Sequence, residues 1–201
     1  MTASSSVVRS VVRAVAMMVC GVSVLGCSEL TGLFDRSPAP SALADASASD
    51  RPESVPADAE PAIVDRVVDG DTVRVIAAPG GTIVEGGSIR VRLLNVDAPE
   101  VARDGQPAQC LADVATNRLA TLLPASSLVW LAADREERDR YDRPLRGLWT
   151  DDGVFVNELL AEEGLVEAVL FPPNDRFHAT VVAAERRAVA AGMGLHGDAC
   201  R

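Results

Sequence analysis

The sequence predicts an α+β fold, a small antiparallel β-barrel of the OB type with three packed helices. Apolar patterns occur along the chain in the order strands, helix, strands, helix, helix. The candidate strands are short and rich in β-branched residues, and glycine-containing turns separate them. An alternating βαβ sheet would instead place a helix between successive strands. The observed order therefore favours a small barrel on which the helices pack.

Three predicted strands make up the first half of the barrel. Two β-branched runs, residues 63–68 and 72–76, flank an Asp-Gly-Asp turn and predict an antiparallel pair. Residues 88–94 predict a third strand, in which apolar side chains alternate with Arg90 and Arg92. Side chains two residues apart lie on the same face of a strand, so both arginines are predicted to share one face.

The rest of the domain predicts one helix, two strands and two further helices, over residues 111–122, 128–131, 145–149, 157–164 and 179–190. Pro124 ends the first of these helices, because proline cannot continue the hydrogen-bonding pattern of a helix. Asn157 is predicted to cap the second helix, and Gly192 is predicted to end the third.

Residues 1–26 have the pattern of an export signal rather than of a folded element. Arg9 and Arg13 precede an uncharged apolar run, residues 14–25, which is too short to span a bilayer comfortably. Gly26 and Cys27 follow, an arrangement that resembles a lipoprotein signal peptide. Cleavage before Cys27 would leave its thiol to carry a lipid anchor on the extracytoplasmic side of a membrane, in the cell envelope. An ordinary signal peptide that contains a cysteine is the alternative.

Residues 27–61 are predicted to form a disordered, acidic tether between the anchor and the domain. Ser, Ala, Pro and Asp dominate this segment, and it lacks the apolar periodicity of a strand or a helix. The globular domain is therefore placed at residues 62–201. It contains two cysteines, Cys110 and Cys200, for which an oxidising compartment favours a disulfide over two free buried thiols.

The charge of the chain argues against a nucleic-acid-binding protein. The formal net charge is −10, and the chain from Cys27 onward carries 17 basic against 29 acidic residues, a net charge of −12. Proteins that bind nucleic acid are usually basic, because the neutralisation of phosphates supplies most of their affinity. All the basic residues are arginine, however, and arginine is the side chain suited to bidentate phosphate contacts.

Acidic residues gather where predicted strands end. Asp69 and Asp71 flank the first turn, and Asp97 and Glu100 follow the third strand. Calcium and similar hard cations take oxygen ligands, so these carboxylates predict a partial metal shell that a backbone carbonyl and waters would complete. The alternative is that they serve only the chemistry of turns. Arg92 lies on the strand that leads to Asp97, so a guanidinium and a metal could approach one anion together.

Residues 68–73, 92–100 and 139–143 resemble the three signature segments of the thermonuclease (staphylococcal nuclease-like) family in order and in spacing. The resemblance extends from about residue 63 to residue 197 and covers nearly the whole domain. It implies a secreted phosphodiesterase that hydrolyses DNA and RNA with Ca²⁺ and leaves 3′-phosphate ends. A monomer is expected, with DNA and RNA as substrates and with the membrane as a partner through Cys27.

The resemblance also implies which residues hold the metal. Asp71, Asp97 and the backbone carbonyl of Ala98 would bind calcium, and Asp69 would be a turn residue beside them. The family usually has threonine where Ala98 stands, but a ligand supplied by the backbone tolerates this change.

The remaining roles that the resemblance implies concern the substrate. Arg92 and Arg143 would bind the phosphate under attack, and Glu100 would act as the general base. Asp142 replaces a glycine of the family pattern and Pro144 follows the arginine, which leaves the pose of Arg143 open.

Two other functions are compatible with the sequence: a catalytically inactive OB-type lipoprotein that binds nucleic acid, and a structural envelope lipoprotein. The acidic residues favour the enzyme, because without a metal they would repel phosphate. Aromatic side chains for base stacking are sparse. Phe171 is placed near the usual tyrosine pair of the family, and Tyr141 is predicted to anchor its loop. His178 and His196 are predicted to be structural or solvent-facing, since neither has a companion at metal-ligand spacing.

Overall fold

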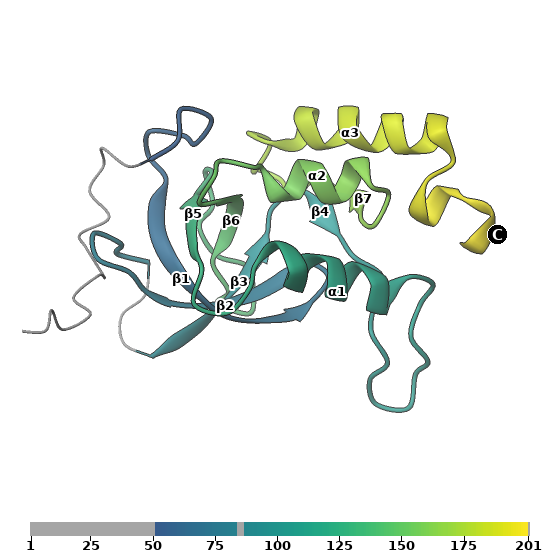
Figure 1. The fold of residues 1–201 in the computed structure, drawn as a ribbon, viewed down its shortest axis with the longest axis horizontal. Helices are drawn as coiled ribbons and strands as arrows, with labels where there is room; N and C mark the ends of the chain where they lie inside the picture. The colour runs from purple at the N-terminus through teal and green to yellow at the C-terminus, as the bar shows by residue number, and fades with distance from the viewer. Residues whose placement is uncertain (1–50, 84–86, 201) are drawn as a thin grey trace, which may run out of the picture. The chain divides into compact units, whose positions relative to one another are not determined.

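The computed structural model describes residues 51–83 and 87–200, and Figure 1 shows their fold. Five strands form a closed barrel in the order β1-β2-β3-β6-β5. Their bounds are Glu60–Asp69 for β1, Thr72–Ala77 for β2, Ser88–Leu93 for β3, Leu128–Ala132 for β5 and Leu145–Thr150 for β6. The α-helices in this part of the chain are α1 (Ala112–Leu122), α2 (Val156–Glu162) and α3 (His178–Ala191).

The remaining elements are short and lie outside the barrel sheet. A two-stranded sheet pairs β4 (Val96–Asp97) with β7 (Glu167–Ala168). The short 3-10 helices η1 (Gly194–His196) and η2 (Asp198–Cys200) follow α3. Helix α3 packs along α2, and α1 packs against β1 (Figure 1).

The predicted α+β fold is confirmed, with one difference in the barrel. β3 and β6 pair in parallel, with Arg92 opposite Leu145, whereas the other neighbouring barrel strands are antiparallel. Strands that alternate in direction cannot close a ring with an odd number of members, so a five-stranded barrel must contain a parallel pair. The barrel is therefore mixed rather than wholly antiparallel.

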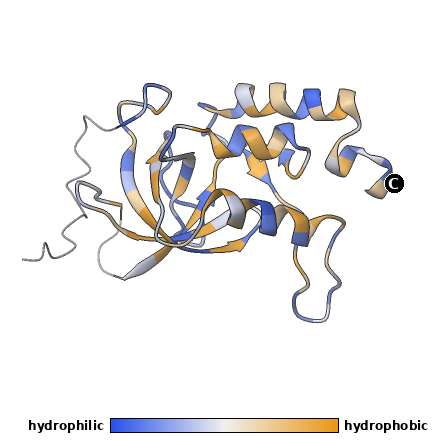
Figure 2. Ribbon diagram, in the orientation of Figure 1, coloured by the Kyte–Doolittle hydropathy of each residue, from blue (hydrophilic) through white to orange (hydrophobic). Residues whose placement is uncertain are grey.

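The alternation of apolar residues along the strands fills the barrel interior. Figure 2 shows hydrophobic and hydrophilic residues interspersed along the strands and helices. The main core includes the buried residues Val64, Val73, Val75, Val91, Leu93, Leu131 and Leu148, covered by Ala115 and Leu119 of α1. Each fully buried aliphatic side chain contributes about 1.5–3 kcal/mol relative to an exposed one. This core holds the strand ends that carry the polar site residues in fixed positions.

Folded structure begins before the boundary predicted at residue 62. Val55 and Ala59 are buried in a second apolar cluster that includes Trp130, and β1 begins at Glu60. These residues lie in turns, where burial leaves no period in the sequence, so their packing could not be predicted. The predicted signal peptide, Cys27 and the tether up to residue 50 lie outside the described residues. Within the described ranges, no helix combines the length and hydropathy of a membrane span.

Asn157 does not cap the second helix. α2 begins at Val156, and Phe155 takes the N-cap position without a side-chain hydrogen bond. Asn157 is buried, and its Oδ1 accepts a hydrogen bond from the backbone N–H of Leu148 (3.0 Å) while its Nδ2 donates to the carbonyl of Leu94 (2.8 Å). An unpaired buried backbone group costs about 1–3 kcal/mol, so this bridge outweighs a cap at the helix end. It ties α2 to the barrel beside the site described below.

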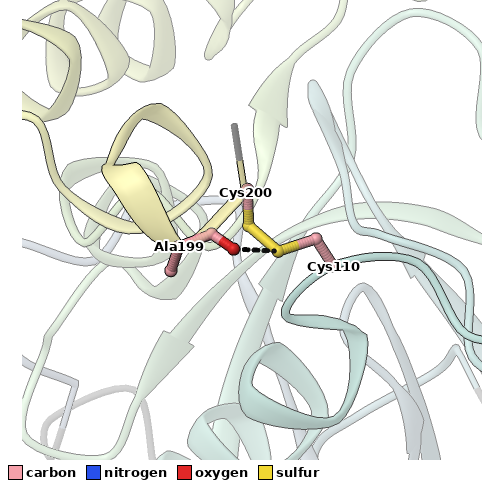
Figure 3. The surroundings of a disulfide bond; sticks show 3 residues. All are labelled: Cys110, Ala199 and Cys200. Carbon is pink, nitrogen blue, oxygen red and sulfur yellow. Dashed lines mark hydrogen bonds between the residues drawn. A yellow bond between two sulfur atoms is a disulfide. The ribbon is translucent and has the colours of Figure 1, made fainter.

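The C-terminal elements agree with the sequence-based expectations. Gly192 ends α3 in a left-handed conformation with φ 62°, which glycine adopts at little cost. The predicted disulfide is confirmed: Cys110 and Cys200 are joined, with their Cα atoms 5.7 Å apart (Figure 3). The disulfide connects η2 to the segment that precedes α1.

Candidate active site

The turn between β1 and β2 places Asp71 in the wall of a cleft. Gly70 lets this turn approach its neighbours, because a Cβ at position 70 would lie 2.7 Å from the Cβ of Ala98 and 2.9 Å from that of Ala115. Asp71 is only 7% exposed. Its Oδ2 accepts a hydrogen bond from the backbone N–H of Ala98 (2.7 Å), and its Oδ1 accepts one from the Thr72 hydroxyl (3.1 Å). The carboxylate is therefore fixed in one orientation.

Arg92, on β3, joins the two predicted metal-binding carboxylates. Its Nη2 lies 3.1 Å from Oδ2 of Asp71 and 2.6 Å from Oδ1 of Asp97. Its Nη1 donates to the carbonyls of Leu93 (2.9 Å) and Val96 (2.7 Å). Four acceptors thus hold the guanidinium, and Arg92 itself is only 7% exposed. Asp71, Asp97 and Arg92 therefore meet at one point in the structure.

Asn95 turns the chain so that Asp97 returns to Arg92, and sequence reasoning missed this role. It has φ 61°, a left-handed conformation that asparagine tolerates better than most residues. Its Nδ2 donates to the carbonyls of Val169 (3.3 Å) and Asn174 (3.1 Å). The signal was an asparagine at the end of a strand, directly before the acidic segment.

Glu100 lines the same cleft as Asp71, Arg92 and Asp97. Its backbone forms a reciprocal pair of hydrogen bonds with Gln109: the N–H of Glu100 donates to Gln109 Oε1 (2.7 Å), and its carbonyl accepts from the N–H of Gln109 (2.9 Å). The exposed carboxylate makes no hydrogen bond within the described residues. Glu100 is therefore held by its backbone and free to act through its side chain.

Arg143 reaches the cleft from the loop before β6. Its Nε donates to Oδ2 of Asp139 (2.7 Å), and its backbone N–H donates to Oδ1 of the same residue (2.9 Å). Burial raises the pKa of Asp139, but these hydrogen bonds outweigh burial and lower it. Asp142 adopts φ 61°, a left-handed conformation that aspartate tolerates better than most residues. The carbonyl of Pro144 accepts the N–H of Arg92 (2.9 Å), which brings the loop beside β3.

The cleft has a volume of about 800 Å³. Six residues were predicted to bind the metal or the phosphate or to act as the base, and five of them line this cleft: Asp71, Arg92, Asp97, Glu100 and Arg143. Ala98 lies in the wall of a neighbouring hollow that it shares with Asp97 and both disulfide cysteines. Seven arginines and five acidic residues line the main cleft. The acidic net charge of the whole chain therefore does not describe the charge at this surface.

Tyr141, predicted to anchor its loop, has an exposed ring, although its hydroxyl accepts a hydrogen bond from Nη2 of Arg140 in the same loop (2.7 Å). It is 64% exposed, and the guanidinium of Arg140 lies 4.7 Å from the centroid of its ring. Phe171 and Tyr141 both line an adjoining hollow, and the centroid of the Phe171 ring lies 5.5 Å from the guanidinium of Arg92. Two aromatic rings therefore border the approach to the site, one more than sequence reasoning placed there.

The donor set suits a hard cation. Asp71 and Asp97 present carboxylate oxygens to the same nitrogen of Arg92, so the two carboxylates face one region of the cleft wall. No group of three or more His, Cys, Asp or Glu side chains that could hold a metal occurs within residues 51–83 and 87–200. Two carboxylates would therefore need a backbone oxygen and waters to complete the shell, which is usual for calcium and magnesium rather than for zinc.

The carboxyl group of Asp71 has a pKa well above its ordinary value. Burial, with a smaller contribution from the charge of Asp69, raises its pKa to about 6, although Arg92, the N–H of Ala98 and the Thr72 hydroxyl act in the opposite direction. Below pH 6 this carboxyl group is mostly protonated, so a cation that binds there has to displace a proton.

This raised pKa predicts how stability changes with pH. Because the pKa of Asp71 is higher in the folded than in the unfolded protein, its contribution is full below about pH 4 and is lost as the pH rises through 6. Relative to Asp71→Asn, the wild type without divalent cations is expected to lose up to about 3 kcal/mol of unfolding free energy between pH 4 and pH 8. Urea unfolding of both proteins across that range measures the difference, and a constant difference would contradict the prediction.

Comparisons with known proteins agree with this geometry. The family described as Staphylococcal nuclease homologue matches residues 90–198. A thermonuclease of Staphylococcus intermedius is 36% identical over 126 residues, which are 63% of this chain and 70% of the relative. A thermonuclease of Staphylococcus hyicus is 33% identical over 123 residues, 61% of this chain and 68% of the relative. An endonuclease of Bacillus subtilis (strain 168) is 32% identical over 115 residues, 57% of this chain and 51% of the relative.

The protein is thus a hydrolase of the nuclease class, built on a five-stranded barrel. Within that class, the chain belongs to the staphylococcal nuclease (thermonuclease) family. The family match begins at residue 90, after the turn that carries Asp71, and the pairing of β2 with β3 brings that turn beside the matched residues.

Proposed function

We propose that this nuclease depends on calcium, hydrolyses phosphodiester bonds of both DNA and RNA, and leaves 3′-phosphate ends. The observation that carries the proposal is the arrangement of Arg92 between the carboxylates of Asp71 and Asp97, 3.1 and 2.6 Å away, in the wall of a cleft. Glu100 and Arg143 line the same cleft. The proposed metal-binding carboxylates, the proposed base and both arginines therefore face one space.

Each residue has a chemical role in this proposal. Calcium held by Asp71, Asp97 and the carbonyl of Ala98 would neutralise phosphate charge and make a bound water more acidic. Arg92 and Arg143 would donate hydrogen bonds to the phosphate oxygens as negative charge builds on them. Nε of Arg92 supports this role, because it makes no hydrogen bond within the described residues.

Glu100 would start the reaction as the general base. Its carboxylate takes a proton from the attacking water, whose oxygen forms a bond to phosphorus. The bond between phosphorus and the 5′-oxygen then breaks, and that oxygen leaves and takes up a proton from solvent. The phosphate stays on the 3′-oxygen of the upstream nucleotide. The unpaired, exposed carboxylate of Glu100 supports this assignment.

Substitution of Glu100 tests the proposal. We expect Glu100→Gln to lower kcat on single-stranded DNA by about 10²- to 10⁴-fold, because the amide cannot accept the proton. Wild-type hydrolysis should require calcium and stop when a chelator is added. Glu53→Gln is the control and should retain full activity, because Glu53 is an exposed acid outside the cleft that makes no hydrogen bond or ion pair within the described residues. Binding of DNA without hydrolysis by the wild type would instead identify an inactive binding module.

We further propose that the chain is exported and anchored in the cell envelope by a lipid on Cys27. The pattern of residues 1–27 supports this proposal. The disulfide between Cys110 and Cys200 supports export, since disulfides persist in oxidising compartments. Expression of Cys27→Ala beside the wild type tests it: the wild type should remain in the membrane fraction and the variant should not. Equal partitioning of the two proteins would reject the anchor.

A further inference from the structure

Two arginines face each other across the β2–β3 pair. The register places Arg74 directly opposite Arg90, two residues along from the pair formed by Thr72 and Arg92. Residues two apart on a strand lie on the same face, so Arg90 shares the face of Arg92. Both Arg74 and Arg90 line the cleft. Like charges directly opposite each other destabilise a sheet, so this pair suits a surface that an anion covers.

Arg74 and Arg90 differ in the hydrogen bonds and ion pairs that they already make. Arg74 donates to the Ser88 hydroxyl (3.0 Å) and carbonyl (2.6 Å) and lies 3.7 Å from Oδ2 of Asp65. Arg90 is exposed and makes no hydrogen bond or ion pair among the described residues. Its guanidinium therefore keeps all its donors for a ligand.

A third arginine, Arg138, lines the same cleft. Arg138 comes from the loop before β6, and its Nη1 donates to the carbonyl of Asp142 (2.9 Å). The Oδ1 of Asp142, 86% of whose side chain is exposed, lies 3.4 Å from that nitrogen, too far for a strong ion pair. Arg138 therefore adds positive charge to the cleft that Arg74 and Arg90 also line.

We propose that Arg74, Arg90 and Arg138 form a second phosphate subsite, which holds the phosphate adjacent to the one that Arg92 contacts. The proposal rests on the proposed nuclease function and adds a preference in substrate length. Arg90 and Arg92 are separated along β3 by about 6.8 Å, two residues of an antiparallel strand. This separation is comparable with that of neighbouring phosphates in one extended strand. The preferred substrate is therefore an internal bond of a polynucleotide rather than a dinucleotide.

The test compares Arg90→Gln with Arg186→Gln, each in a Glu100→Gln background that slows hydrolysis. Arg186 is an exposed arginine on α3 that also makes no ion pair among the described residues, so both variants remove one unpaired charge. Binding of a fluorescent 12-nucleotide DNA and of a dinucleotide is measured with calcium at several salt concentrations. We expect Arg90→Gln to weaken binding of the 12-mer and to reduce its salt slope by about one, and Arg186→Gln to leave that slope at the parent value.

The outcomes separate the subsite from the nuclease function. A slope for the 12-mer that is the same in both variants would overturn the subsite, as would an equal loss of affinity for the 12-mer and the dinucleotide. Hydrolysis by the wild-type protein is measured separately. If the wild type fails to cut DNA while Arg90→Gln still reduces the slope, the nuclease proposal fails and the subsite stands as a binding site. Thermal unfolding of Arg90→Gln should not fall below that of the parent, because the substitution relieves a like-charge pair.

Discussion

Replacement of Arg92 by lysine is expected to lower kcat by about 10³-fold or more, in the range seen when an arginine that stabilises a phosphoryl transition state is removed. Arg92 uses a planar fork, with Nη1 on two backbone carbonyls and Nη2 on Asp71 and Asp97. A lysine ammonium keeps the charge but cannot satisfy these acceptors and the phosphate together. In this variant the hydrogen bond that Arg92 is proposed to donate to the reacting phosphate should therefore be lost.

Lysine is chosen in this experiment because removal of the positive charge would lower stability as well as activity, and the two losses could not be separated. Asp71 is buried, and loss of its cationic partner costs about 3–5 kcal/mol of stability in buried ion pairs. Arg118→Lys is the matched control, because Arg118 forms a comparable two-nitrogen pair with Glu163 (2.6 and 2.8 Å) on the helices, outside the cleft. Steady-state kinetics at saturating calcium measure kcat. A decrease in kcat of less than tenfold for Arg92→Lys would show that catalysis does not need the planar guanidinium.

Removal of the disulfide is expected to lower the stability of the protein substantially. The bond between Cys110 and Cys200 closes a loop across a sequence separation of 90 residues. Its loss in the Cys110→Ser, Cys200→Ser variant should lower the unfolding free energy by about 2–5 kcal/mol. Urea unfolding at neutral pH measures this change. A decrease below about 1 kcal/mol would mean that the C-terminal segment is held by its packing instead.

The same variant should also slow catalysis while it remains folded. Cys110 follows Gln109, whose side chain and backbone hold the backbone of Glu100 at 2.7 and 2.9 Å. Release of the C-terminus lets this segment move, so Glu100 spends less time in its working position. Gln109→Ala keeps the disulfide and removes one of the two hydrogen bonds, so it should lower kcat without the large loss of stability. Unchanged kcat in both variants would show that Gln109 does not position Glu100.

Much of the site could be predicted because its residues follow local patterns. A tight Asp-Gly-Asp turn between two β-branched runs places Asp71 at a strand end, and the alternation on β3 places Arg90 and Arg92 on one face. The roles of Asn95 and Asn157 were not predicted, because each depends on backbone groups that are distant in sequence. An asparagine looks the same in sequence whether it caps a helix or bridges two strands.

The sequence by itself determined the order of the five barrel strands and three α-helices, the likeness of three segments to one nuclease family and the candidate pairing of Cys110 with Cys200. These features depend on periodicity, turn residues and spacing, and each of those can be recognised within a short stretch of sequence. Only the tertiary structure decided that β3 and β6 run in parallel, that Val55 belongs to a core and that Arg74 faces Arg90. The physical reason is that strand pairing and burial depend on which distant surfaces exclude water together, and no single segment specifies its partner.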